Sequence, residues 1–184
     1  MADELDAGTK LDIYKLVLGR YKNLISEKES LSISEIRQKA SPYTEFIRKK
    51  REDMLKDIVP YDQRQHFFLA AERAMDYVRR IKTCEFSFTF YMDFKEMESL
   101  RVATVMDKAI LLTALLRSFE SEDARVLVSK KGRVFVKFSH KGSPYMFVPE
   151  SGSLLMGDDA MKLLSDDPIA YCFNDLIYEN YEET

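Results

Sequence analysis

Apolar residues recur at helical spacing through the first eighty positions of the chain. Every third or fourth position is apolar in two stretches: Leu11, Tyr14, Leu18, Tyr21, Ile25 and, further on, Phe67, Phe68, Ala71, Met75, Val78, Ile81. This spacing places each set on one face of a helix. Residues 34–55 between them are also helical in composition. We expect Ser41 to cap a helix that starts at Pro42 and runs to Ile58, because proline is favoured in the first helical position.

The hydrophobic period changes to two after Glu85. Phe86, Phe88 and Phe90 alternate with polar or less apolar residues, which predicts a half-buried strand. Residues 104–118 then carry apolar side chains on too many sides for a helix with one buried face. Thr104 followed three positions later by Asp107 is typical of a helix N-terminus. The sequence therefore predicts a helix here that is buried all round.

Three short strands are predicted after the buried helix, at residues 124–130, 133–139 and 144–149. Short connections that contain Gly132 and Gly142 join them, so we expect hairpins and an antiparallel sheet. Two weaker helices are predicted at residues 158–165 and 168–178, followed by an acidic tail that we expect to be frayed. The predicted fold class is α+β, with a helical region at residues 1–82 and a core at residues 83–184 in which the buried helix packs on the sheet.

Composition narrows the possible chemistry. The chain of 184 residues has a net charge of -3, so it lacks the strong positive field of a dedicated nucleic-acid binder. It contains only 2 histidines and 2 cysteines. Cys84 and Cys172 lie in apolar surroundings and are expected to be free thiols. The first residues are acidic, and no apolar run approaches the roughly 18 residues of a membrane span, so we expect a cytoplasmic protein without membrane association.

Several common sites are missing from the sequence. The glycines stand singly, which argues against a phosphate-binding loop, and the histidines and cysteines have no zinc-ligand spacing. We therefore expect no cofactor and no metal. His66 is predicted to be a partly buried packing residue, and His140 a hairpin-tip residue. The acidic pairs at residues 158–159 and 166–167 are best explained as helix N-termini or turns.

Four segments between residues 85 and 155 carry a family resemblance. They are Met106-Asp107-Lys108-Ala109 with its leucine-rich continuation, Ala124-Arg125-Val126, Val134-Phe135-Val136 and Pro149-Glu150-Ser151-Gly152. In this order and spacing they resemble the core of the transglutaminase-like superfamily. That resemblance implies a cysteine at the start of the buried helix, a histidine on a following strand and an aspartate on the next, which together form a catalytic triad.

All three triad residues are replaced in this chain. The family's cysteine falls on Val105, its histidine on Arg133 and its aspartate on Val148, while the strand tryptophan falls on Phe135. Only Asp107 keeps the family's polar residue on the helix. Because acyl transfer by this route needs a thiolate that a histidine activates, we predict a pseudoenzyme.

Three functions remain open. In the first, a cleft at Arg133, Phe135 and Asp107 binds a peptide or protein partner, with Arg133 suited to a carboxylate or phosphate. The second is association with nucleic acid through a basic run on a predicted helix, Arg48, Lys49, Lys50 and Arg51, although a solvated helix face also explains that run. The third is an enzyme with an unrelated, carboxylate-based site.

The first predicted helix presents an apolar face formed by Tyr14, Leu18, Tyr21 and Ile25. This face has two candidate roles: it covers the former catalytic cleft, or it forms a homodimer. The sequence leaves both roles open.

Overall fold

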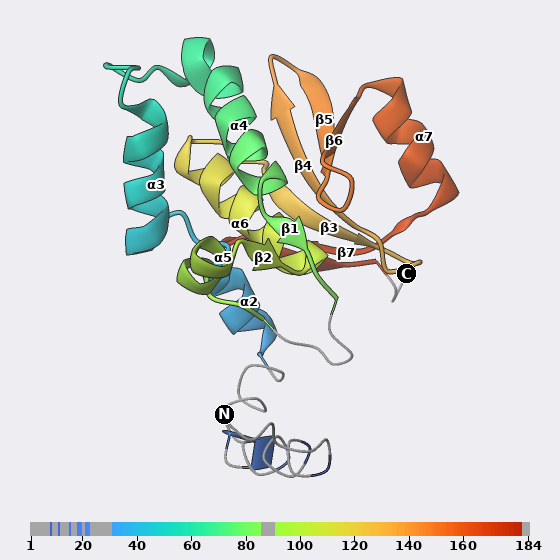
Figure 1. Cartoon of the computed structure of the whole chain (residues 1–184). Helices are drawn as coiled ribbons and strands as arrows, with labels where there is room; N and C mark the ends of the chain where they lie inside the picture. Colours follow the sequence, from blue (N-terminus) through green and yellow to red (C-terminus); the bar gives the residue numbers. More distant parts are fainter. Residues whose placement is uncertain are drawn as a thin grey trace.

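The computed structural model describes residues 31–85 and 91–181, together with residues 8, 11, 15, 18, 19, 21 and 22. Its elements show an α+β fold in which helices precede an antiparallel sheet (Figure 1). In chain order they are α2 (Ile33–Lys39), α3 (Glu45–Leu55), α4 (Gln63–Arg79), β1 (Lys82–Thr83), α5 (Phe94–Leu100), β2 (Val102–Ala103), α6 (Val105–Ser118), β3 (Arg125–Ser129), β4 (Val134–His140), β5 (Ser143–Val148), β6 (Ser153–Met156), α7 (Asp158–Asp166), β7 (Ile169–Phe173) and β8 (Tyr178–Asn180).

The main sheet has six strands in the order β6-β5-β4-β3-β7-β8, and every neighbouring pair is antiparallel. Strands β3 to β6 follow one another as a meander, and the chain then returns through α7 to place β7 on the other side of β3. Gly132 and Gly142 adopt positive φ angles of 77° and 80° in the first two hairpin turns, a conformation that glycine adopts without strain. The predicted hairpins and antiparallel sheet are confirmed.

Helix α6 is the buried helix that the sequence predicted. Every residue from Asp107 to Leu116 is buried, and the Thr104 side chain caps the helix by accepting a hydrogen bond from the Asp107 N–H. The helix packs against α3 and α4 on one side and against β3 and β4 on the other, as Figure 1 shows. Its leucines therefore meet apolar side chains in both directions.

The two faces of the sheet belong to different apolar clusters. Val136 and Phe138 of β4 lie in the large cluster with α4 and α6, whereas Phe135 lies in a smaller cluster with Ala160 of α7. This division follows from the alternation of side chains along a strand. The large cluster also includes Ile47 of α3, so residues on both sides of the predicted boundary at residue 82 share one core.

The predicted helix at residues 42–58 is wrong at both ends. Helix α3 begins at Glu45, where the Thr44 hydroxyl accepts a hydrogen bond from the Ile47 N–H at 3.3 Å, and it ends at Leu55. Ser41 instead accepts a hydrogen bond from the Tyr43 N–H in the preceding turn. Two capping residues stand three positions apart in this sequence, and the second of them starts the helix.

The predicted helix at residues 168–178 is also wrong, because this segment forms strands β7 and β8. Tyr171 and Phe173 pack toward the large cluster, while Cys172 lies in the small cluster on the opposite face. The sequence of a strand that is covered on both faces is a continuous apolar run, and hydrophobic periodicity cannot distinguish such a run from a buried helix. Cys172 consequently lies on a strand and not on a helix face. The strand predicted at residues 86–90 falls outside the described residues.

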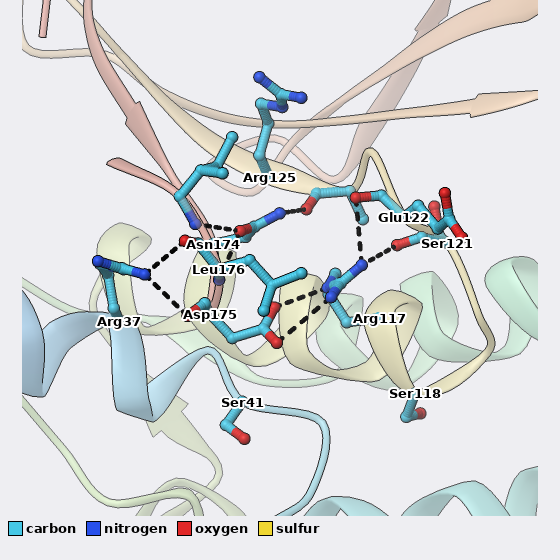
Figure 2. A network of polar contacts seen from close by, with 12 residues as sticks. Arg37, Ser41, Arg117, Ser118, Ser121, Glu122, Arg125, Asn174, Asp175 and Leu176 are labelled. Carbon is cyan, nitrogen blue, oxygen red and sulfur yellow. Dashed lines mark hydrogen bonds and ion pairs between the residues drawn. The ribbon is translucent and has the colours of Figure 1, made fainter. Parts of the chain in front are cut away.

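The acidic tail at residues 174–184, which we expect to be frayed, is folded over its described part, residues 174–181: the loop at Asp175 contacts α6, and β8 pairs with β7. The Asp175 carboxylate pairs with the Arg117 guanidinium (Figure 2), with Nε and Oδ1 2.6 Å apart. The side chains of Arg117 and Asp175 are only 9% and 7% exposed, respectively. Asn174 donates to the Ala124 carbonyl, and Arg37 of α2 donates to the carbonyls of Asp175 and Leu176. The loop between β7 and β8 therefore joins α2, α6 and the sheet.

Replacing Asp175 with alanine should lower the free energy of unfolding by about 3–5 kcal/mol, because it leaves the buried Arg117 charge without its carboxylate. Urea denaturation measures this loss. Asp76→Ala is the matched control, since Asp76 forms an ion pair with Arg79 at the surface and such pairs contribute at most about 1 kcal/mol. Equal losses in the two variants would contradict a structural role for the buried pair.

Candidate functional site

A cavity of about 270 Å³ lies at the N-terminal end of α6. We call it the aromatic pocket, and it is lined by Ile33, Ile36, Tyr91, Met106, Tyr171, Phe173 and Tyr178. The first two residues come from α2, Met106 from the first turn of α6, and the last three from β7 and β8. Four of the seven side chains are aromatic, so the walls are mostly carbon with hydroxyl groups only on the tyrosines.

A buried carboxylate stabilises the helix end beside this pocket. The Thr104 hydroxyl donates to Asp107 Oδ2 at 2.8 Å, and the Met92 N–H donates to Oδ1 at 3.2 Å. Burial raises the pKa of Asp107 to about 6, although these hydrogen bonds and the charge of Lys39 oppose the shift. The pKa of Tyr91 is raised as well, first by burial and then by the nearby Asp107 charge. The polar groups at this end of α6 thus bond to one another.

Cys84 lies close to the same helix end, which the sequence did not indicate. Strands β1 and β2 pair in parallel, and the Cys84 N–H donates to the Ala103 carbonyl at 2.9 Å. A parallel pair of two residues per strand leaves no hydrophobic pattern that could have predicted this contact. Burial, followed by repulsion from the Asp107 charge, raises the pKa of the Cys84 thiol. The environment therefore disfavours the reactive thiolate.

The structure does not bring together the three residues of the predicted ligand cleft, Arg133, Phe135 and Asp107. Asp107 is buried on the α6 side of the sheet, whereas Phe135 lies in the small cluster on the α7 side. The Arg133 guanidinium lies 5.6 Å from the centre of the Phe135 ring and donates from Nε to Asp167 at 2.6 Å. Of the three degenerate triad positions, Val105 starts α6, and Val148 packs against the small cluster on the α7 side of the sheet, which contains Phe135. A shift of one residue along a strand moves a side chain to the opposite face of the sheet. Residues that are matched to the family by their spacing therefore need not lie together in this protein.

The basic run on α3 is only partly available to a ligand. Lys50 forms an ion pair with Glu98 and lies over the Tyr77 ring, and Arg51 donates from Nε to the Ser118 carbonyl at 2.8 Å. Arg48 and Lys49 are exposed. Two of the four cations therefore help attach α3 to its neighbours.

Neither histidine lies at the aromatic pocket. His140, at the end of β4, packs 5.6 Å from the ring centres of both Phe67 and Phe68, and burial with the nearby Lys141 charge lowers its pKa. His66 is partly buried, as predicted, and accepts a hydrogen bond from the Asp62 N–H. Both cysteines are free thiols, as predicted.

Two further observations concern the described part of the chain. Its histidines, cysteines and carboxylates nowhere form a group of three or more that could hold a metal ion. None of its helices is both long enough and apolar enough to cross a bilayer. Of the apolar face predicted on the first helix, Leu18 and Tyr21 are exposed, while Tyr14 and Ile25 fall outside the described residues.

Comparisons with known proteins found no matching family model, no matching curated protein and no matching solved structure. The transglutaminase-like resemblance therefore stays a prediction from the sequence.

The raised pKa of Asp107 predicts a pH-dependent stability. The folded protein holds this proton up to about pH 6, whereas the unfolded chain releases it near pH 4, so the free energy of unfolding falls as pH rises between these values. Relative to Asp107→Asn, the wild type should lose about 2–3 kcal/mol across this range. Urea denaturation at a series of pH values measures the difference in the free energy of unfolding. The Asp53→Asn variant is the control, because it removes one carboxylate from an exposed position. A difference that is constant with pH would contradict the prediction.

Proposed function

We propose that this protein is a non-catalytic binding module whose aromatic pocket receives a large apolar or aromatic side chain from a protein or peptide partner. The observation that carries the proposal is the lining of the pocket. It combines tyrosine, phenylalanine, methionine and isoleucine without a thiol, a carboxyl group or an imidazole. Such a lining can exclude water from a ligand, but it offers no group suited to nucleophilic or acid–base catalysis at neutral pH.

The size of the pocket supports a side chain as the occupant. Its volume of about 270 Å³ is below the range of roughly 300–1,000 Å³ that is usual for small-molecule sites. Protein interfaces, in contrast, often concentrate their binding energy in one aromatic or aliphatic residue that fills a pocket. Tyrosine and methionine, which form much of this lining, are also enriched at such interfaces.

The sequence resemblance supports the absence of catalysis. The helix start that would carry a transglutaminase-like nucleophile holds Val105, and the adjacent Met106 lines the pocket. The thiol closest to this helix end, that of Cys84, has a raised pKa. A transglutaminase-like pseudoenzyme that keeps a binding role agrees with both features.

Association with nucleic acid through Arg48–Arg51 has less support. Lys50 and Arg51 already bond within the protein, which leaves Arg48 and Lys49 as the exposed part of the run. Two exposed cations supply little of the phosphate neutralisation on which such binding depends.

Both cysteines should react slowly with a thiol reagent. At neutral pH, iodoacetamide should label Cys84 and Cys172 more slowly than it labels free N-acetylcysteine, because burial raises the pKa of both thiols and lowers the thiolate fraction. Mass spectrometry of the wild type and of the Cys84→Ser and Cys172→Ser variants measures the two rates. Fast labelling of either thiol, together with release of ammonia from a glutamine peptide, would contradict a non-catalytic function.

The pocket itself is tested with peptides selected from a random displayed library. Enriched peptides should share one aromatic or large aliphatic residue, and Ile33→Asp should weaken their binding about tenfold or more, as loss of an interface anchor does. Ile33 is at the first position of α2, where an acidic residue suits the helix dipole, so this variant should fold. Tyr43→Asp places the same charge at another exposed position and should bind normally. Selected peptides that bind Ile33→Asp as tightly as the wild type would refute the proposed site.

A further inference from the structure

A second cavity, of about 420 Å³, lies on the α7 side of the sheet and shares no residue with the aromatic pocket. We call it the cationic groove, because Arg125 of β3, Lys137 of β4 and Lys130, just after β3, all line it. The protein as a whole has a net charge of -3, so a groove with three cations differs in sign from the rest of the molecule.

Two of these cations are held side by side by the sheet. Arg125 and Lys137 are direct partners in the antiparallel register of β3 and β4. Like charges in this arrangement destabilise a sheet unless an opposite charge lies nearby. Glu179 of β8 supplies one carboxylate, 3.5 Å from Arg125 Nη1. Within the described residues, neither Lys130 nor Lys137 forms an ion pair through its ammonium group, so the groove keeps an excess of two positive charges, three cations less one carboxylate.

The polar and apolar parts of the groove are separated along the strands. Near Arg125, the Cys172 thiol lies 3.4 Å from Glu179 Oε2 and 3.8 Å from the Tyr181 hydroxyl. Leu127 and Ile169 continue the groove toward the other end of β3 and β7, where the Lys130 N–H bonds to the Pro168 carbonyl. A ligand in this groove therefore meets charge at one end, apolar side chains in the middle and a further cation beyond them.

We propose that the cationic groove binds a phosphate monoester carried on a partly apolar body, with the phosphate between Arg125 and Lys137 and the body over Leu127. A phosphate monoester carries a charge of about -1.5 to -2 at neutral pH, which balances the excess charge of the groove. Guanidinium and ammonium groups form strong charge-assisted hydrogen bonds to its oxygens. The volume of the groove is in the range that holds small ligands.

NMR of the isotope-labelled full chain tests this site, with phenyl phosphate and inorganic phosphate as probes. Phenyl phosphate should shift the amide signals of Arg125, Leu127 and Cys172 saturably, should bind more tightly than inorganic phosphate, and should weaken as salt is added. Lys137→Gln and Lys130→Gln should each weaken binding, Lys137→Gln by about fivefold to tenfold. Lys49→Gln removes an exposed lysine from α3 and should bind as the wild type does.

A peptide that carries phosphotyrosine identifies the source of the phosphate. Tighter binding than phenyl phosphate would assign the groove to a phosphorylated protein, and equal or weaker binding would assign it to a small molecule. Ile33→Asp should leave phenyl phosphate binding unchanged, which keeps this test independent of the aromatic pocket.

Three results would overturn the phosphate site. One is the absence of saturable shifts up to about 10 mM phenyl phosphate, a concentration above the dissociation constant of any useful binding site. Another is a Lys137→Gln variant that binds as tightly as the wild type. The rest of its NMR spectrum must be unaltered, which shows that the variant is folded. The third is an oligonucleotide that binds more tightly than phenyl phosphate and loses its affinity steeply with salt.

Discussion

The burial of α6 on all sides is the constraint on which the other elements depend. Its leucines lie between α4 and the sheet, so neither layer can form its core without the helix. The ionisable groups on α6 receive partners from distant segments: Asp107 from Met92, Lys108 from Thr83 and Arg117 from Asp175. Thr113, in the middle of the helix, has a buried hydroxyl without a partner among the described residues, and such a group costs about 1–3 kcal/mol. The apolar burial of α6 outweighs that cost.

The two candidate sites lie on opposite faces of the same sheet. The aromatic pocket opens beside α6, between α2 and the last two strands, and the cationic groove lies beside α7. Strand β7 serves both, because Tyr171 and Phe173 face the pocket while Cys172 faces the groove. One strand thus gives the protein an apolar surface and a charged surface that can be altered separately.

Local patterns in the sequence predicted the elements whose burial follows a simple period. The continuous apolar run of α6, its Thr104 cap and the glycine turns of the β3–β5 meander are signals of this kind. Strand β7 was mistaken for a helix because both of its faces are covered. The aromatic pocket could not be predicted, since Ile33, Met106 and Tyr178 come together only through the tertiary fold. Aligning a motif by spacing placed Arg133 and Phe135 beside Asp107, but such spacing does not fix which face of a strand a residue occupies.

The position of β7 also determines when the protein can complete its fold during synthesis. The ribosome makes the helices and strands β3 to β6 first, but β3 lacks one neighbouring strand until residues 169–173 have been made. Arg117 likewise lacks its carboxylate partner until Asp175 has been made. A nascent chain that has not reached Asp175 therefore has an unpaired strand edge and an unneutralised arginine beside apolar side chains. Exposed edges and apolar surface of this kind promote aggregation, so the chain depends on its last strands, or on chaperones, to cover β3.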